Sequence, residues 1–442
     1  MKILIAVHGF PPTHSAGAER RAERMVRWLP AQGHQVTVFT VESLEAPAFS
    51  VNTTSDNGST IHRLSYNVSE GNHFHNLYDF PQIGQAFLDV LASDTFDLVH
   101  VVSGYLLGGQ VILNARQAGI PVVVTLTEYW FMCARLNLIR ATGEVCSGPE
   151  TDAKCARCLM EDKRRYRFIS QSAPQPVTEL FWSLMEHSPV SHAMTQTIKE
   201  RRITLRQVLE TADLVISPSR YLMNKFAEFG FDTQKFVFMR QGLQKPAPDL
   251  KPPPEPPSST LTLGYVGQIK YHKGVDLLVD AVIDLLNSGF QLNLELWGSE
   301  TEEPDYVAAL KAHTRAYPSI QWKGRYLGSD VWKVLSGFDT LVIPSRWYEN
   351  SPNVILEAYE TKLPVIGTNL GGTSELIEHG KTGLCFELNN KDDLLQQIKR
   401  ILQEPGLLPN LRANIPPVKS IHDEMTELVV HYQSLIHSAQ GS

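Results

Sequence analysis

The residues best suited to chemistry fall in one stretch, residues 344–383, which reads PSRWYENSPNVILEAYETKLPVIGTNLGGTSELIEHGKTG. Ser351 is a favourable N-cap and Pro352 suits the first position of a helix, so we expect a helix to begin there. The amides of Asn353 and Val354 are then unpaired donors at the positive end of that helix. This arrangement predicts a binding site for an anion such as a diphosphate.

Two glutamates and two glycines accompany this helix start. Glu349 precedes the cap, and Glu357 lies about two turns into the helix, where a carboxylate can accept hydrogen bonds from a ribose diol. Gly371 and Gly372 occupy the next turn from strand to helix, where backbone can approach a ligand closely. Two glutamates at this spacing are by themselves more often solvated helix charges. The whole string in its strand–loop–helix context favours a ligand site.

The elements that carry these residues alternate along the chain. Continuous Val/Ile/Leu runs at 2–7, 35–40, 97–102, 120–126 and 212–219 are separated by helical patterns, which predicts parallel βαβ units. The same alternation restarts at residue 262. The fold class is therefore α/β, with two doubly wound Rossmann-like domains. Ligands of such sheets bind at the carboxyl ends of the strands, so we expect a central cleft between the domains.

The predicted domain boundaries follow from composition. Residues 1–244 form the N-terminal domain, and residues 245–259 form a stiff linker, because seven prolines stand between 246 and 257. Residues 260–418 form the C-terminal domain. Residues 419–442 carry apolar side chains at helical spacing, which predicts a C-terminal helix that packs back on the N-terminal domain.

The chain resembles the retaining glycosyltransferases of family 4, which have the GT-B fold. The resemblance lies in the 344–383 stretch and in three further segments, GYVGQIKYHKGVDLL (264–278), ADLVISPSRYL (212–222) and GHQVTVFT (33–40). The resemblance covers nearly the whole chain. It matches the family's E-x7-E signature to Glu349 and Glu357 and its GG-x-x-E to Gly371, Gly372 and Glu375. It implies that Glu349 contacts the donor sugar and that Glu357 holds the nucleoside ribose.

Two positions near the expected donor depart from the family pattern, or keep it only in part. The family has an arginine where this chain has Gln268, and Lys273 keeps the second cation that grips the donor diphosphate. We expect Lys270 or Arg346 to substitute for the missing arginine. In the glycine-rich loop after the first strand, usually GG-x-E, only Gly17 of the glycine pair is present.

A further departure lies in VTLTEYWFMC (124–133), where many relatives read T-L-H-D-Y-W and the histidine lies beside the donor sugar. Thr127 and Glu128 occupy the histidine and aspartate positions, and a hydroxyl does not titrate near neutrality as an imidazole does. Three consequences are conceivable: the histidine is dispensable, another group such as His100 helps, or activity is altered. The first is favoured, because in a front-face reaction the leaving phosphate can accept the acceptor's proton.

Four of the five cysteines, Cys133, Cys146, Cys155 and Cys158, form a C-x12-C-x8-C-x-x-C pattern in a cysteine-rich insertion, 133–158. Four thiolates suit tetrahedral zinc with a structural role. An iron–sulfur centre and four free thiols are the alternatives. Catalysis itself needs no metal cofactor in this interpretation.

Composition limits the possible partners. The 40 basic and 47 acidic side chains give a net charge of −7, which argues against a nucleic-acid binder. No apolar run approaches the ~18–20 residues of a membrane helix, and the N-terminal apolar stretch is too short for a signal peptide. We expect a cytoplasmic protein with at most peripheral contact at the inner face of a membrane. Two interpretations of the basic run KRRYR (163–167) stay open. It contacts anionic lipid or glycan phosphates, or it is a solvated helix face, and a solvated face is the commoner case for such a run.

The sequence thus predicts a retaining, metal-independent glycosyltransferase that uses a nucleotide-diphosphate sugar. Its acceptor is expected to be a glycan or a lipid-linked molecule in bacterial polysaccharide or other surface-glycan synthesis. The alternatives are a catalytically silent GT-B scaffold and a non-transferase such as a nucleotide-sugar epimerase. A phosphorylase would need a pyridoxal-type lysine site, and the sequence does not identify one.

Overall fold

The computed structural model describes residues 1–14, 16–42, 49–66, 78–245 and 260–440. The chain divides into two compact units, Met1–Arg240 with Ile421–Ser442 (unit 1) and Gln241–Ser420 (unit 2). The proline-rich linker expected at 245–259 lies, apart from Lys245, outside the described residues. No helix in the described ranges is both long and apolar enough to cross a membrane.

Unit 1 is built on an eight-stranded sheet in the order β3-β4-β2-β1-β5-β6-β7-β8. All its paired strands are parallel except β3 and β4, which form an antiparallel pair. The inner strands β1, β5, β6 and β7 are almost entirely buried, as expected for strands covered on both faces. The strands are β1 Lys2–Val7, β2 Gln35–Glu42, β3 Val51–Asp56, β4 Ser59–Ser65, β5 Leu98–Val102, β6 Val122–Thr125, β7 Leu214–Ser217 and β8 Phe236–Phe238.

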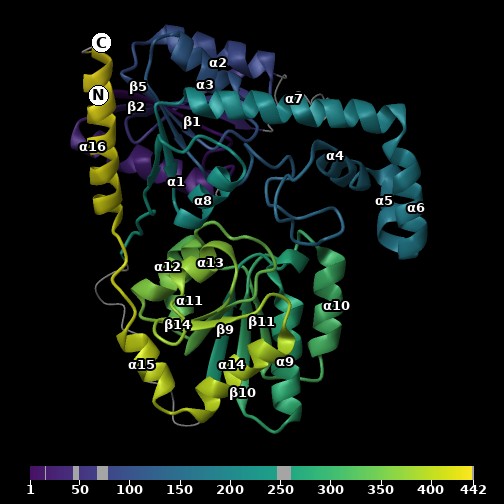
Figure 1. The fold of residues 1–442 in the computed structure, drawn as a ribbon. Helices are drawn as coiled ribbons and strands as arrows, with labels where there is room; N and C mark the ends of the chain where they lie inside the picture. Colours follow the sequence, from purple (N-terminus) through teal and green to yellow (C-terminus); the bar gives the residue numbers. More distant parts are fainter. Residues whose placement is uncertain (15, 43–48, 67–77, 246–259, 441–442) are drawn as a thin grey trace. The chain divides into compact units, whose positions relative to one another are not determined.

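Several helices of unit 1 lie in a long insertion between β6 and β7. In that insertion α4 packs on the 23-residue α7, and α5 and α6 lie at one end of α7 (Figure 1). The helices are α1 Gly17–Trp28, α2 Pro81–Ser93, α3 Gln110–Gln117, α4 Asp152–Glu161, α5 Arg164–Ser172, α6 Gln175–Glu186, α7 Pro189–Thr211, α8 Arg220–Glu228 and α16 Ile421–Gln440.

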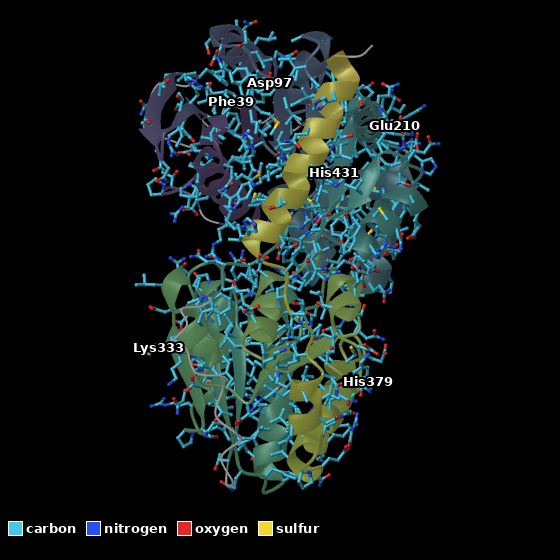
Figure 2. All side chains as sticks on the ribbon, turned by 90° about the vertical axis from the view of Figure 1, so that its left-hand side faces the viewer. Phe39, Asp97, Glu210, Lys333, His379 and His431 are labelled. Carbon is cyan, nitrogen blue, oxygen red and sulfur yellow. The ribbon has the colours of Figure 1, made fainter. Side chains whose placement is uncertain are left out.

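The last helix, α16, belongs to unit 1 although unit 2 precedes it in the chain. Its Met425, Leu428 and Tyr432 are fully buried in the same core as the apolar residues of β1 and α1. A buried ion pair of 2.8 Å joins Arg21 of α1 to Glu424. Figure 2 shows α16, with His431 labelled, running along this unit. The prediction that the C-terminal helix packs on the N-terminal domain is confirmed.

Unit 2 contains a six-stranded, all-parallel sheet in the order β11-β10-β9-β12-β13-β14. One apolar core includes residues of α9, α10, α14 and α15, and a second, separate core includes residues of α11 and α12. The sheet is therefore doubly wound. The strands are β9 Leu261–Val266, β10 Leu292–Trp297, β11 Ile320–Gly324, β12 Thr340–Ile343, β13 Val365–Thr368 and β14 Gly383–Phe386. The helices are α9 Val275–Asn287, α10 Pro304–Thr314, α11 Val331–Leu335, α12 Asn353–Glu360, α13 Gly371–Leu376, α14 Lys391–Gln403 and α15 Leu407–Ala413.

Candidate functional site

The candidate site of unit 2 lies where the strand order reverses. β9 is followed in the chain by its neighbour β10, whereas its other neighbour, β12, comes later in the chain. The loops after β9 and β12 therefore start side by side at the carboxyl edge of the sheet, where α/β sheets bind ligands. These two loops carry Lys273 and Glu349.

Glu349 and Lys273 form the centre of this site. The Lys273 ammonium is 2.7 Å from Glu349 Oε1, and it lies 4.7 Å from the centre of the Trp347 ring. The same carboxylate oxygen accepts hydrogen bonds from Ser345 Oγ at 2.9 Å and Trp347 Nε1 at 2.8 Å. Glu349 is buried, so its charge is fixed in position by two neutral donors and one cation. A pair held in this way is preorganised toward a bound ligand.

Close backbone contacts hold the two loops together. A Cβ on Gly274 would stand 1.9 Å from the carbonyl oxygen of Pro344, so only glycine allows this approach. A Cβ on Gly372 would stand 1.8 Å from the carbonyl oxygen of Asn350, and the Gly372 amide donates to Glu349 O at 2.6 Å. In the structure, the missing side chain of Gly372 thus lets the backbone of α13 lie against the Glu349 loop. The sequence analysis had predicted that the backbone at Gly371 and Gly372 approaches a ligand instead.

Arg346 is engaged within unit 2. Its guanidinium donates to both carboxylate oxygens of Asp276, at 2.6 and 2.8 Å, and also to Asn389 Oδ1 at 2.8 Å and Tyr271 O at 3.0 Å. Burial acts to raise the pKa of Asp276, but hydrogen bonds from Arg346 and Tyr306 bring it below its ordinary value. Arg346 is therefore a structural cation, and the expectation that it substitutes for the missing arginine is wrong.

Gln268 and Lys270 lie on the loop after β9. Gln268 is exposed, and its side-chain nitrogen is 3.5 Å from Glu302 Oε1. The Lys270 ammonium is 3.6 Å from the other oxygen of Glu302. These are long contacts, so both side chains can turn toward a ligand at little cost.

The start of α12 differs by one residue from the prediction. The helix begins at Asn353 with Pro352 as its N-cap, because ψ of Pro352 is 114° and therefore not helical. The prediction of Ser351 as N-cap is wrong. Asn353 and Val354 remain the first residues of the helix, so their amides have no partner within it.

Gln241 is a residue of this site that sequence reasoning missed. Its side-chain nitrogen donates to Ser351 O at 2.7 Å and to Asn353 Oδ1 at 2.9 Å. Its own Oε1 and the Ser351 hydroxyl are buried, and neither has a hydrogen-bond partner among the described residues. Unpaired buried polar atoms beside a helix N-terminus favour a polar ligand there. No sequence signal marks Gln241, since it lies about 110 residues before the helix that it contacts.

Glu357 lies on the second turn of α12 and is partly buried. It belongs to the same helix whose N-terminus provides the free amides, eight residues after Glu349. The structure thus places Lys273, Glu349, Asn353, Val354 and Glu357 on two neighbouring loops and one helix of unit 2.

In unit 1, polar residues gather at the carboxyl ends of β5 and β6. Glu128 accepts hydrogen bonds from Ser103 at 2.7 Å and from Thr127. Burial raises the pKa of Glu128, and these two hydroxyls offset part of that rise. Glu19 contributes to the same upward shift, and its carboxylate is 3.7 Å from His8 Nε2. Thr127 therefore acts on Glu128 as a hydroxyl donor.

Two atoms of this group in unit 1 are buried without hydrogen-bond partners among the described residues, namely His8 Nδ1 and Glu19 Oε2. Burial lowers the pKa of His8 to about 4, so its ring is neutral near pH 7. Sequence reasoning named neither residue as a candidate, although Glu19 stands in the glycine-containing loop. Gly17 begins α1, and no described atom lies within 4 Å of where its Cβ would stand.

His100 does not face a ligand site. It is fully buried on β5, where Nε2 is 2.7 Å from Thr125 Oγ1 and Nδ1 contacts the Tyr432 hydroxyl of α16. Burial lowers its pKa well below the ordinary value. The expectation that His100 helps on the acceptor side is therefore wrong, because the ring joins the core of unit 1 to α16.

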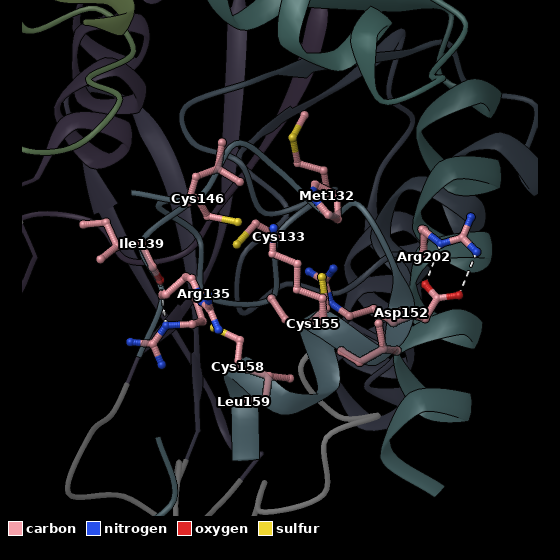
Figure 3. A pocket seen from close by; sticks show the side chains of 17 residues that line it. Met132, Cys133, Arg135, Ile139, Cys146, Asp152, Cys155, Cys158, Leu159 and Arg202 are labelled. Atoms are coloured by element: carbon pink, nitrogen blue, oxygen red, sulfur yellow. Dashed lines mark hydrogen bonds and ion pairs between the residues drawn. The ribbon is translucent and has the colours of Figure 1, made fainter. Parts of the chain in front are cut away.

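The four clustered cysteines line one cavity of about 40 Å³. In Figure 3 Cys133 and Cys146 point toward one another, and Cys155 and Cys158 lie one turn apart on α4. All four are free thiols. Burial raises the pKa of Cys155 to about 12 and that of Cys158 to about 11. Within the described ranges, no group of three or more Cys, His, Asp or Glu side chains is already spaced to hold a metal.

A buried cation lies beside these thiols. Arg201 of α7 lines the same cavity and is 3% exposed, and it donates to the carbonyl oxygen of Trp130. Burial lowers the pKa of Arg201 to about 10. Among the neighbouring groups that raise this pKa, Cys133 and Cys155 have the largest effect. Arg201 has no carboxylate within ion-pair distance among the described residues. Its neighbours Cys133 and Cys155 are neutral thiols near pH 7, because burial raises the pKa of both.

Two family models match the chain and together cover most of it. The model described as "Glycosyl transferase 4-like domain" matches residues 16–242, which is more than half of the chain. The model described as "Glycosyl transferases group 1" matches residues 260–404. The two matches correspond to most of unit 1 and most of unit 2.

Individual relatives match over shorter stretches. An alpha-D-kanosaminyltransferase from Streptomyces kanamyceticus is 26% identical over 154 residues, which is 35% of this chain and 39% of the relative. A glycogen synthase from Thermus thermophilus is 27% identical over 161 residues, 34% of each chain. The chain thus matches well under half the length of these relatives.

Solved structures resemble the whole fold. A sucrose-phosphate synthase from Thermosynechococcus elongatus has a TM-score of 0.69 at 18% identity and covers 99% of this chain and 100% of its own. HepE from Anabaena in complex with UDP-glucose has a TM-score of 0.61 at 15% identity, with full coverage of both chains. The lipopolysaccharide outer core galactosyltransferase WaaB has a TM-score of 0.61 at 12% identity, covering 98% and 100%. With its two doubly wound sheets and its match over more than half of its length, the chain belongs to the GT-B glycosyltransferases of the glycosyl transferase 4-like family.

Proposed function

We propose that this chain is a retaining glycosyltransferase that moves a sugar from a nucleotide-diphosphate donor to an acceptor hydroxyl. The observation that carries the proposal is the Lys273–Glu349 pair, fixed at 2.7 Å, with Glu349 on the loop that leads into α12, whose first amides have no partner within the helix. A cation, a helix N-terminus and an oriented carboxylate are the groups that a sugar diphosphate requires at its reacting end.

The donor is assigned to unit 2 by the polarity of these groups. The amides of Asn353 and Val354 take the diphosphate oxygens, and the unpaired Ser351 hydroxyl adds a further donor. Glu357 accepts from the ribose hydroxyls, and Glu349 contacts the donor sugar. Gln268 completes the proposed set in unit 2 as a neutral donor. The role of Gly17 of unit 1, which the resemblance implies, stays a prediction.

The proposed reaction proceeds on one face of the donor. The bond between the anomeric carbon and the leaving phosphate oxygen breaks, and a bond from the same face to the acceptor oxygen forms. The proton of the acceptor hydroxyl passes to the leaving phosphate, so no protein base is needed. Lys273 stabilises the charge that grows on that phosphate. Because the protein supplies a cation and amide donors, the proposed catalysis is independent of metal.

The acceptor is assigned to unit 1. Thr127 and Glu128 are the candidates, with Ser103 holding Glu128 from the other side. We extend the proposal to glycan or lipid-linked acceptors in bacterial surface-glycan synthesis. Support comes from WaaB, a structural neighbour that is a lipopolysaccharide galactosyltransferase. The cytoplasmic location expected from the sequence stays a prediction.

We also propose that Cys133, Cys146, Cys155 and Cys158 hold one structural zinc. The residues suit the metal, because four thiols share one cavity and a zinc bound to four thiolates carries two negative charges. The buried Arg201 is then the compensating cation. The four thiolates would hold the zinc and leave no open position for catalysis, so its role would be structural. An iron–sulfur centre is the alternative.

The decisive experiment for the activity has two stages. A thermal-shift screen with UDP-, GDP- and ADP-sugars identifies the donor, because a ligand that binds the native state raises Tm. Donor hydrolysis and transfer are then followed by NMR, which reports the configuration of the product at the anomeric carbon. Retention of configuration is expected. Inversion would refute the mechanism, an epimerised donor would favour an epimerase, and no turnover of any bound donor would favour a silent scaffold.

A further inference from the structure

The helical hairpin of α5 and α6 exposes an unusual number of apolar side chains. Of the eleven large apolar side chains that are exposed in the described residues, five lie between residues 168 and 190. Phe168, Leu184 and Leu180 are 75%, 70% and 64% exposed. Single exposed apolar residues are common, but a concentration of this kind marks a surface that contacts something else.

The apolar residues of α6 share one face of that helix. Val177, Leu180 and Leu184 follow the i, i+3, i+7 spacing. The other face packs inward, where the Trp182 indole donates to Ser170 Oγ at 3.2 Å and stacks edge-on with Tyr166. The hairpin therefore already has its own small core, and its exposed apolar face is additional to it.

Positive charge lies on the other helix of the hairpin, at the start of α5 and directly before Phe168 in the chain. The run 163–167 contains Lys163, Arg164, Arg165 and Arg167, all exposed, and residues 163–178 contain no Asp or Glu. The acidic residues that flank this stretch are both paired, Asp162 with Arg135 at 2.9 Å and with Arg167 at 3.7 Å, and Glu179 with Arg157 at 2.9 Å. This local charge contrasts with the net charge of −7 of the whole chain.

We propose that the α5–α6 hairpin docks on the surface of a bilayer that contains anionic phospholipids. Arginines beside an apolar helix face suit the boundary between anionic headgroups and acyl chains. A second copy of the chain fits less well, because pairing this surface with itself would bring two sets of like charges together. The proposal goes beyond sugar transfer and is independent of the donor and the acceptor.

Vesicle flotation with the full chain tests the proposal without any sugar. Vesicles of phosphatidylcholine with about a third phosphatidylglycerol should bind the chain at least about tenfold more tightly than phosphatidylcholine alone. Raising the salt from ~0.1 M to ~1 M should weaken that binding, because the cations are exposed and screened. Equal binding to both vesicle types, or none, would overturn the proposal.

Two sets of variants separate the apolar and the ionic contributions. The combination Phe168→Ser, Leu180→Ser and Leu184→Ser should reduce binding by about tenfold or more, and so should Arg164→Gln with Arg165→Gln and Arg167→Gln. The matched controls in unit 2 are Leu327→Ser, which is 71% exposed in wild type, and the exposed trio Lys311→Gln, Arg315→Gln and Lys333→Gln. Controls that lose as much binding would refute the assignment to the hairpin.

Two further measurements distinguish bilayer docking from misfolding of the variants and from self-association. Circular dichroism and Tm of each variant show that folding is kept, and the charge variants remain informative if the apolar triple variant does not fold. Light scattering after size exclusion, without lipid, tests for a second copy. If the wild type is a dimer that the apolar triple variant converts to a monomer, the surface is an interface between copies and the bilayer proposal is wrong.

Discussion

Lys273 provides the sharpest test of the reaction at the scale of single residues. Its ammonium lies 2.7 Å from Glu349, whereas Thr127 donates to Glu128. Lys273→Ala should lower kcat by on the order of 10²–10³, as removal of one preorganised donor does. Thr127→Ala should cost far less, because a hydroxyl neither titrates nor bears the developing charge.

Steady-state kinetics with the donor found in the screen measure both variants. Lys311→Ala on α10 is the control, since Lys311 is exposed and paired with Glu300 at 2.6 Å. A Thr127→Ala variant as damaged as Lys273→Ala would contradict the front-face mechanism.

Substitution of the two glutamates of the E-x7-E signature should affect different quantities, nucleotide affinity for Glu357 and kcat for Glu349. Glu357→Ala should weaken binding of the free nucleoside diphosphate by ~1.5–3 kcal/mol, because ribose hydroxyls lose a charged acceptor. Glu349→Ala should mainly lower kcat, with nucleotide binding largely kept. Isothermal titration calorimetry and kinetics on the two variants separate these effects. Unchanged affinity in Glu357→Ala would remove that residue from the site.

Individual site residues were predictable to different degrees. Glu349 and Lys273 were named because the segments that carry them, 344–383 and 264–278, resemble the signature segments of a known family. The strand order that brings their loops together was known only from the structure. His100 was misjudged because α16 covers it, and a contact across about 330 residues leaves no local signal. Arg346 was misjudged for a similar reason, since it lies on a loop and its carboxylate partner Asp276 lies on α9, 70 residues earlier in the chain.

At the scale of elements, the contact of α13 with the Glu349 loop can be tested through Gly372. A methyl group there would stand 1.8 Å from Asn350 O, so Gly372→Ala should displace the loop that orients Glu349. We expect kcat to fall by about tenfold or more, as displacement of catalytic groups does, with the fold retained. Gly406→Ala is the control, since no described atom lies within 4 Å of that Cβ position. Kinetics and circular dichroism measure the pair, and an unaffected Gly372→Ala would show that the loop tolerates displacement.

The cysteine cluster joins the loop after β6 to α4, and its metal content can be measured. Elemental analysis should find about one zinc per chain, with the four thiols protected from alkylation until a chelator is added. Cys385, in unit 2, is an internal reference for a cysteine outside the cluster whose pKa burial also raises, to about 11. Purified protein with four freely reacting thiols and no metal would contradict the zinc proposal, and inorganic sulfide with iron would favour the alternative.

The elements that sequence reasoning found were those with strong hydrophobic patterns. The inner strands were predicted because both of their faces are buried. The β3–β4 hairpin was not, because every residue of β3 is exposed. Its Asn57-Gly58 turn, with φ of 49° and 76°, was the available signal, since Asn-Gly favours tight hairpins. The helices between 152 and 211 were also missed, because their packing depends on one another and on α7.

At the scale of the molecule, stability should depend on pH through buried histidines. Burial, with help from Lys273, lowers the pKa of His272 to about 4. The unfolded chain takes up this proton near pH 6.5 and the folded chain only near pH 4, so His272 disfavours the folded state increasingly as pH falls between these values. The effect is up to about 3 kcal/mol at pH 4. His272→Gln should therefore flatten the decline of Tm between pH 7 and pH 4, and an unchanged decline would contradict the assignment.

The attachment of α16 to unit 1 should be costly to disturb. Arg21 and Glu424 are both buried, so Glu424→Gln leaves an uncompensated guanidinium in the core. We expect unit 1 to lose about 3 kcal/mol of unfolding free energy. Thr426→Ala, at an exposed position of the same helix, is the control. Denaturant titration measures both variants, and equal stability would show that water or another group replaces Glu424.

The return of α16 to unit 1 also sets the order in which the chain can fold during synthesis. Domains generally fold as they leave the ribosome, beginning with the N-terminal one. Here residues 1–240 emerge first, but their core lacks Met425, Leu428 and Tyr432 until α16 has been translated. Unit 2, which is continuous from Gln241 to Ser420, is complete before then. We therefore expect unit 2 to reach its native state on the ribosome before unit 1. Until α16 has been translated, the side of the unit 1 core that α16 covers stays exposed.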